Sequence, residues 1–254
     1  MSVDVLVLRF DAPLMSFGGT VVDQINPTRD FPGRAMLAGL LGNALGYDHR
    51  DTEALEALQA RVRWAAREDL PGKAFMDYQT VNLIAPYMLE GWTTRGQPEG
   101  RKGGDNATAI RNRHYLANAV YIVAVTLSAG SGPDVDALDR AVQRPARPLF
   151  LGRKCCIPST PLRYARVSTE RLRDALVHPE VPRVVRTAKR GSDRALSLRP
   201  RAWWPVDEGT EIGRTIAFTD DMDWANQLHV GRRYVQEAYV ELPVAPAAAE
   251  EHAS

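Results

Sequence analysis

Cysteines are scarce in this sequence and long apolar runs are missing. The 254 residues include only 2 cysteines, adjacent as Cys155 and Cys156, which is too few for a disulfide framework or a four-cysteine zinc site. No stretch approaches the ~18 consecutive apolar residues that a membrane-spanning helix needs. The N-terminus lacks the basic leader and small-residue cleavage site of a signal peptide. We therefore expect a cytoplasmic protein with no membrane partner.

Patterns of metal, phosphate and redox sites are also missing. The 5 histidines form no HxH, HxxxH or HExxH pair, so the sequence predicts no metal site. The glycine-containing segment 96–102 has neither the spacing of a phosphate-binding loop nor its following serine or threonine. The adjacent cysteines lack the CxxC spacing of redox motifs. We therefore expect no cofactor.

Lysine is rare, and the basic charge is concentrated in one part of the chain. Only 4 of the 32 basic residues are lysines. Arginine suits nucleic acid because its planar guanidinium forks onto phosphate and stacks on bases, although a GC-rich genome produces the same excess. The net charge is −3 over residues 1–143, +11 over 144–201 and −7 over 202–254. Such a concentrated basic block predicts a polyanionic partner.

Hydrophobic periodicity predicts a mixed chain of helices and strands. Residues 3–10 alternate as in a buried strand. Residues 33–46 repeat at helical spacing up to Gly46, a suitable C-cap, and we expect Gly39 and Gly42 to let this helix approach the sheet. Further elements are predicted as helices at 52–60, 133–143 and 169–177, and as strands at 61–67, 74–84, 119–127, 213–218 and 234–242. Residues 85–112, polar and glycine-rich, are typical of a functional or disordered insertion.

One catalytic arrangement remains open from the residues alone. A metal-free ribonuclease needs a base for the 2′-hydroxyl, a cation for the developing charge and an acid for the leaving oxygen. His114 and Tyr115, where the insertion rejoins the core, and Lys154 in a basic turn have suitable chemistry if the fold brings them together. The alternative, which we favour, is that His114 and Tyr115 pack in the fold or contact RNA.

Five segments, taken in order, resemble a known family. They are NPTRDFPGR (26–34), LAGLLGNALG (37–46), DYQTV (77–81), RHYL (113–116) and RPLFLGRKC (147–155). The set resembles the CasD family, the RAMP-superfamily subunits of the type I-E CRISPR Cascade complex, over residues 3–162. The order of elements, strand, helix, strands, insertion, strand and helix, also resembles the ferredoxin-like plan.

The resemblance implies an α+β, ferredoxin-like (RRM/RAMP) fold with a long thumb hairpin. It implies a non-catalytic RNA-binding subunit that holds the 5′ handle of the CRISPR RNA (crRNA) and caps the Cascade backbone. Its implied partners are the backbone subunit CasC, the large subunit CasA and, through the complex, target DNA in antiviral defence. Type I-C relatives are themselves nucleases, so the alternative is a metal-independent endoribonuclease that processes repeat RNA. Gln79, where relatives often carry histidine, counts against that alternative.

The resemblance also implies a division of the chain. We expect an RRM-like core at 1–81 and 115–166, a thumb insertion at 82–114, a β-rich C-terminal region at 167–242 and a disordered tail at 243–254. The acidic charge of the C-terminal third is expected either to face a basic partner or to keep the free chain soluble.

The implied RNA-binding residues belong to four parts of the chain, and none is expected to be catalytic. Thr28 and Arg34 come from a polar loop and helix start, and Gly152 lets the backbone approach RNA where neighbouring cations meet phosphate. The full set is Thr28, Arg34, Arg101, Lys102, Arg111, Arg113, Tyr115, Arg147, Gly152, Arg153 and Lys154.

Overall fold

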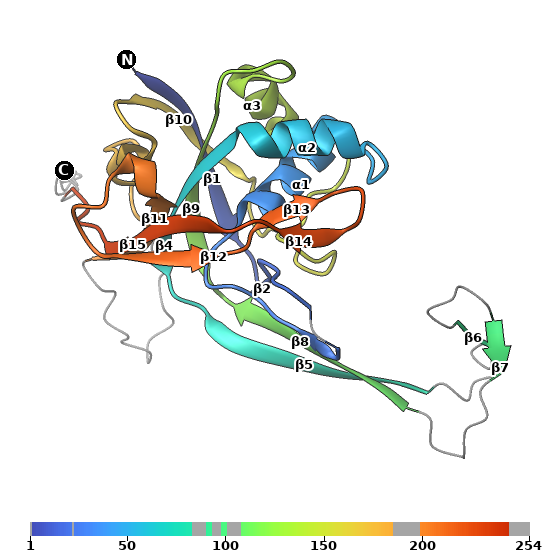
Figure 1. Ribbon diagram of the computed structural model, residues 1–254. Helices are drawn as coiled ribbons and strands as arrows, with labels where there is room; N and C mark the ends of the chain where they lie inside the picture. The colour runs from blue at the N-terminus through green and yellow to red at the C-terminus, as the bar shows by residue number, and fades with distance from the viewer. Residues whose placement is uncertain are drawn as a thin grey trace, which may run out of the picture.

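The computed structural model of this protein combines helices with mostly antiparallel sheets (Figure 1). It describes residues 2–21, 23–82, 90–92, 98–100, 108–184 and 199–243. The largest sheet has 7 strands in the order β10-β1-β9-β4-β11-β15-β12. Each neighbouring pair in this order is antiparallel. The expected mixture of helices and sheets is confirmed.

One half of the large sheet comes from the first two thirds of the chain. Its strands are β1 (Val3–Asp11), β4 (Val62–Leu70), β9 (Val120–Leu127) and β10 (Arg163–Thr169), with helices α1 (Arg34–Leu45), α2 (Thr52–Arg61) and α3 (Val135–Gln143). Along β1, Leu6 and Leu8 pack on the helix side, whereas Val5 and Val7 face the short 3-10 helix η2 (Leu172–Val177). All four are fully buried, because the sheet is covered on both faces.

The C-terminal region contributes three strands to the same sheet. They are β11 (Arg201–Pro205), β12 (Arg214–Phe218) and β15 (Arg233–Tyr239), accompanied by the 3-10 turn η3 (Val206–Glu208) and a hairpin of β13 (Asp221–Asp223) and β14 (Leu228–Val230). Strand β11 joins the two halves by pairing with β4. Trp203 packs into the helix-side core and Trp204 into the opposite one. The predicted strands near 213–218 and 234–242 are confirmed, whereas β11, β13 and β14 have no counterpart in the prediction.

A long hairpin leaves the body of the molecule (Figure 1). Strands β5 (Lys73–Asn82) and β8 (Thr108–Ala117) pair along their whole length, and β2 (Leu14–Met15) and β3 (Ile25–Asn26) also pair with β8. Two short strands, β6 (Glu90–Trp92) and β7 (Pro98–Gly100), pair farther out. The arms of the hairpin therefore include residues 73–81 and 115–117, which the prediction assigned to the core. These residues belong to a second sheet, because they pair with each other and with β2 and not with strands of the large sheet.

The glycines of α1 serve contacts other than the expected approach to the sheet. A Cβ at Gly42 would lie 2.6 Å from Leu55 of α2, and one at Gly39 would lie 3.2 Å from Trp224 of the β13–β14 hairpin. The helix therefore approaches another helix and the C-terminal hairpin through these two positions. Gly46 ends it with φ of 93°, as the sequence predicts.

A buried ion pair lies on the η2 side of the sheet. Arg67 and Asp69 of β4 are fully buried, with Arg67 Nε 2.5 Å from the Asp69 carboxylate. The Arg67 guanidinium also donates to the Val181 carbonyl, and the Val184 amide donates to Asp69 (2.7 Å). The pair therefore holds the chain after η2 against the sheet, with its remaining hydrogen-bonding groups satisfied by backbone.

Two further expectations concern the C-terminal tail and the absence of a membrane-spanning helix. Of the tail expected to be disordered, only Pro243 is described, and residues 244–254 lie outside the described residues. Among the helices that the structure describes, none is both long and apolar enough to cross a membrane.

Candidate RNA interface

The turn that carries Gly152 packs directly on the loop after β2. The Ser16 amide donates to the Leu151 carbonyl (3.0 Å), and the Cys156 amide closes the turn by donating to the Arg153 carbonyl (2.8 Å). Gly152 has φ of 99°, and a Cβ at this position would lie 1.7 Å from the Ser16 carbonyl oxygen. Only glycine fits here, since any side chain would clash with backbone and adopt an unfavourable φ.

Arg153 connects the turn to two strands. Its guanidinium donates to the backbone carbonyls of His114 (2.8 Å) and Asn26 (2.9 Å), and its carbon lies 4.6 Å from the centre of the Tyr115 ring. Among the described residues no carboxylate forms an ion pair with it. The guanidinium is thus fixed in place by neutral groups, and no carboxylate of the described residues compensates its positive charge.

Tyr115 is a structural side chain of this site. It is only 3% exposed, and its hydroxyl lies 3.5 Å from the Cys155 sulfur. Burial and the hydrogen bond to Cys155 raise the pKa of Tyr115, and Arg153 opposes this shift only in part. The neighbouring residue His114 points to the opposite face of β8, since successive strand residues alternate. The structure therefore does not bring His114 and Tyr115 together as an acid–base pair.

Other predicted RNA contacts come from the loop at Thr28, from the Gly152 turn and from β8. The Thr28 hydroxyl accepts from the Phe17 amide (2.9 Å) and donates to the Arg29 carbonyl, which joins two loops beside the Gly152 turn. Lys154 is exposed, and no hydrogen bond or ion pair of its side chain occurs within the described ranges. Arg111 donates to the Asp23 carbonyl (2.6 Å) from an exposed position on β8. On the same strand Arg113 is half-buried, whereas Arg101 and Lys102 lie outside the described residues.

Two of the predicted contacts are placed differently from the expectation. Arg34 forms a two-pronged ion pair with Asp221, with Nε 2.6 Å from Oδ1, so its charge is already neutralised within the chain. Arg147 donates to the Tyr47 carbonyl (2.5 Å), beyond the C-terminal end of α1. Gly152 lies by the opposite end of that helix, next to residues 33–36. Arg147 is therefore not part of the Gly152 cluster.

The start of α1 is occupied by an acidic residue from the C-terminal region. The Asp220 carboxylate, 1% exposed, accepts from the Arg34 amide (2.7 Å) and from the Arg233 guanidinium (3.1 Å). The Asp220 carbonyl accepts from the Ala35 amide (2.9 Å). Because the helix N-terminus favours negative charge, Asp220 stabilises α1 there and fills the position where an anion would bind.

The acidic C-terminal third is neutralised largely by arginines of this chain. Its carboxylates pair as Arg63–Glu208, Arg173–Glu211, Arg214–Glu237 and Arg201–Glu237, besides the pairs of Asp220 and Asp221. Whether this charge also faces a basic partner or keeps the free chain soluble stays a prediction. Arg153 and Lys154 differ from these arginines in having no such partner among the described residues.

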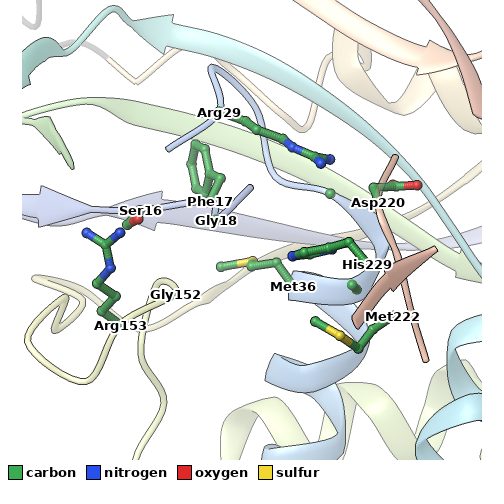
Figure 2. A pocket seen from close by; sticks show the side chains of 12 residues that line it. Ser16, Phe17, Gly18, Arg29, Met36, Gly152, Arg153, Asp220, Met222 and His229 are labelled. Atoms are coloured by element: carbon green, nitrogen blue, oxygen red, sulfur yellow. The ribbon is translucent and has the colours of Figure 1, made fainter. Parts of the chain in front are cut away.

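An open cavity of about 270 Å³ lies between the Gly152 turn and the C-terminal hairpin. Figure 2 shows Ser16 and Arg153 at one end, Asp220, Met222 and His229 at the other, and Met36 between them. Burial and the charge of Arg29 lower the pKa of His229, while Asp221 and Asp220 oppose that shift. Ser16, Arg29 and His229 were not among the predicted site residues. No local signal marks His229, because a fold contact brings it to a loop more than 200 residues earlier in the chain.

No metal-binding cluster of three or more histidine, cysteine, aspartate or glutamate side chains occurs in the part of the chain that the structure describes. The cations and glycines gathered at the Gly152 turn instead suit an extended anion, since they combine backbone approach with positive charge.

Comparisons with known proteins identify relatives. The family model described as "CRISPR-associated protein (Cas_Cas5)" matches residues 5–241. The Escherichia coli (strain K12) protein "CRISPR system Cascade subunit CasD" is 32% identical over 158 residues, which are 62% of this chain and 68% of that protein.

Solved structures share the fold. A chain of a "CRISPR RNA-guided surveillance complex" has a TM-score of 0.65 at 22% identity, covering 94% of this chain and 91% of that chain. A chain described as "Crystal structure of Cas protein" has a TM-score of 0.54 at 20% identity, covering 95% and 100%. Since the family model spans nearly the whole sequence and the curated relative agrees with it, this protein belongs to the Cas_Cas5 family of CRISPR-associated proteins and is a CasD-like member of it.

Proposed function

We propose that this protein is a non-catalytic crRNA-binding subunit of a type I-E Cascade surveillance complex. It holds the 5′ handle of the crRNA, caps the backbone for antiviral DNA interference, and acts in the cytoplasm. Its relative CasD is a Cascade subunit, and a chain of the same fold belongs to an RNA-guided surveillance complex. CasC beside the hairpin, CasA nearby and target DNA through the complex are the proposed partners.

A ferredoxin-like RAMP domain underlies this proposal. The strand order β10-β1-β9-β4, built from the sequence β1-α1-α2-β4-β9-α3-β10, supports it, because it is the β-α-β-β-α-β arrangement with one added helix. In the division of the chain that we propose, the thumb is the insertion at 82–114, and β11 to β15 belong to the C-terminal β-rich region.

The uncompensated charge at the Gly152 turn is the observation that carries the proposal. Arg153 is held by carbonyls and by the Tyr115 ring, so it presents a fixed guanidinium that no carboxylate in the described part of the chain pairs with. Lys154 follows it in an exposed position. Cations next to a glycine that exposes backbone are suited to the phosphates of a single-stranded RNA.

A first experiment is to purify the tagged protein from cells carrying its operon and to sequence the RNA that it retains. We expect RNAs that share one repeat-derived 5′ end, together with several other subunits. Heterogeneous RNA, or none, would contradict the proposal.

The same preparation tests the alternative of an endoribonuclease. His114 and Tyr115 point to opposite faces of β8, which disfavours it. If the protein cleaves repeat RNA without metal and the His114→Ala variant does not, the protein is an endoribonuclease and the non-catalytic role is wrong.

A second experiment asks whether the Gly152 turn contacts phosphate. Lys154→Ala removes one exposed cation. The plot of log binding constant for handle RNA against log salt concentration should therefore become less steep, its negative slope decreasing in magnitude by about 0.7. Arg147→Ala is the matched control, since it removes an exposed cation of the same basic block at the other end of α1. Equal slopes for Lys154→Ala and the unmodified protein would remove the turn from the interface.

A further inference from the structure

A second basic surface lies where helices α1 and α3 end. Arg140 and Arg144 line an open groove of about 620 Å³ at this place. The other residues that line this Arg140 groove are small, apolar or uncharged: Ala44, Leu45, Ala141, Gln143 and Ala146. Both arginines are exposed, and within the described ranges neither side chain forms a hydrogen bond or an ion pair.

The carboxylates of the neighbouring segments belong to other arginines. Asp139, the residue before Arg140, is only 10% exposed at its side chain and pairs with Arg163 (2.8 Å). In the loop after α1, Asp48 lies 3.9 Å from Arg147. The positive charge of the Arg140 groove is therefore not neutralised by the described part of the chain.

Helix stability does not account for this charge. Cations near a helix C-terminus are favourable because the last carbonyls carry partial negative charge. At the end of α1, however, the Gly46 amide already caps the helix, and the Ala146 amide donates to the Ala44 carbonyl (3.0 Å). Arg140 and Arg144 are also four residues apart, a spacing at which like charges on a helix repel. The two arginines together thus suit a partner with negative charge.

The groove is separate from the surface proposed for the crRNA handle. The Gly152 turn lies next to residues 33–36 at the start of α1, whereas the groove includes residues 44 and 45 at its end. The 12 residues of α1 span about 18 Å at 1.5 Å per residue. A polyanion in the groove is therefore a different nucleic acid segment from the one at the Gly152 turn.

The lining of the groove favours a nucleic acid duplex over two other polyanionic partners. None of the described residues that line it is aromatic, and sites for single strands stack bases on aromatic side chains. An acidic protein would need an apolar or aromatic anchor at the centre of its interface, where the groove offers mainly alanine. Arginines beside small side chains suit close approach of a phosphate backbone, because the guanidinium forks onto phosphate.

We propose that the Arg140 groove contacts the sugar-phosphate backbone of double-stranded DNA, with Arg140 and Arg144 on its phosphates. The inference rests on the proposed function, since the complex is what brings DNA to this chain. It gives the chain a direct contact with DNA besides its contact with crRNA. The contact does not depend on base sequence, because it reads phosphates alone.

The test uses the complex assembled on crRNA and a DNA duplex without a match to that crRNA, so that the two DNA strands stay paired. The variant carries Arg140→Gln together with Arg144→Gln. In a plot of log binding constant for this duplex against log salt concentration, we expect the negative slope to decrease in magnitude by about 1.8, or about 0.9 for each phosphate contact. At about 0.1 M salt, binding should weaken at least tenfold.

A matched control removes two positive charges elsewhere. Arg171→Gln with Arg199→Gln has the same change in net charge, and both arginines are exposed and pair with exposed carboxylates, Glu211 and Glu241. This control should bind the duplex with the slope of the unmodified complex.

Two further measurements separate loss of contact from loss of structure. The groove variant should bind handle RNA with an unchanged slope, since the Gly152 turn is at the other end of α1. Arg144→Gln alone, which follows the last residue of α3, should decrease the slope for the duplex by about 0.9 and covers the case that the double variant does not fold.

The outcomes distinguish the two proposals. If the complex does not bind repeat RNA, the proposed function fails. If it binds repeat RNA but the groove variants keep the full slope for the duplex, the DNA contact is wrong while the proposed function stands. If the complex made with the groove variant instead lacks a subunit that the unmodified complex contains, the groove binds an acidic protein and the DNA contact is equally overturned.

Discussion

Gly152 and Gly132 have nearly the same backbone angle in very different surroundings. Their φ angles are 99° and 101°. A Cβ at Gly152 would lie 1.7 Å from the Ser16 carbonyl, whereas the nearest atom to one at Gly132 is the end of the Arg61 side chain at 3.5 Å. The two positions thus separate the effect of backbone conformation from that of steric contact.

We expect Gly132→Ala to lower the free energy of unfolding by about 1–2 kcal/mol, the cost of the left-handed conformation. Gly152→Ala should cost about 2–5 kcal/mol, since it must also push the loop at Ser16 away from the turn. Urea denaturation followed by tryptophan fluorescence measures both. Equal losses in the two variants would mean that the close approach at Ser16 is relaxed without cost.

The arginines of the predicted interface show what a motif can and cannot establish. Sequence marks Arg34 and Arg153 alike, as cations next to glycine. The structure separates them, because Arg34 is neutralised by Asp221, whereas the contacts of Arg153 with the described residues are to neutral groups. Asp221 lies 187 residues from Arg34 along the chain, and no local pattern reveals a pairing that depends on the complete fold.

At the scale of elements, α1 depends on a residue that is not part of it. Its N-cap residue is Gly33, which has no side chain to accept the first amides. The Asp220 carboxylate takes that role from the C-terminal region. The start of the helix is therefore stabilised by a contact between distant parts of the chain, at the same place where the cavity forms.

We expect Asp220→Ala to lower the free energy of unfolding by about 3 kcal/mol or more. The variant leaves the Arg34 amide without its acceptor and the partly buried Arg233 without its carboxylate. Glu211→Ala is the control, because the Glu211 side chain is 60% exposed in its ion pair with Arg173 and the pair should contribute less than about 1 kcal/mol. Thermal unfolding of both variants checks this, and a similar small loss in each would show that Asp220 does not hold the helix.

Hydrophobic periodicity predicted those helices and strands whose own sequence carries a clear hydrophobic pattern. The alternation in residues 3–10, the continuous apolar run at 119–127 and the helical spacing in 33–46 and 133–143 correspond to β1, β9, α1 and α3. Strand β11 was not predictable in this way. Its five residues include a proline and two adjacent tryptophans, and it is a strand because β4 and β15 lie on either side of it.

The same reasoning applies to the candidate site. The Gly152 turn could be found from its glycine and cations, whereas Ser16 and His229 could not, since each is an ordinary residue until the fold places it beside the cavity.

At the scale of the whole molecule, the C-terminal region completes the core. Trp203 of β11 stacks on Phe31, with ring centres 5.1 Å apart, and Phe31 stacks on Trp64 at 5.7 Å. All three rings are nearly or fully buried. Arginines and carboxylates also pair across this boundary, so the region contributes both apolar contacts and charge compensation to the rest of the chain.

A chain ending at residue 184 should therefore fail to fold. It loses β11, β15 and β12, leaves β4 as an open edge and exposes Trp64 and Phe31 to water, which removes a large share of the apolar burial that stabilises a chain of this size. The control is a chain ending at Pro243, which keeps every described strand and should have an unchanged Tm. Circular dichroism on heating compares the two: cooperative unfolding of the shorter chain would show that the N-terminal elements form an independent domain, and its absence would show that both parts of the sheet fold as one unit.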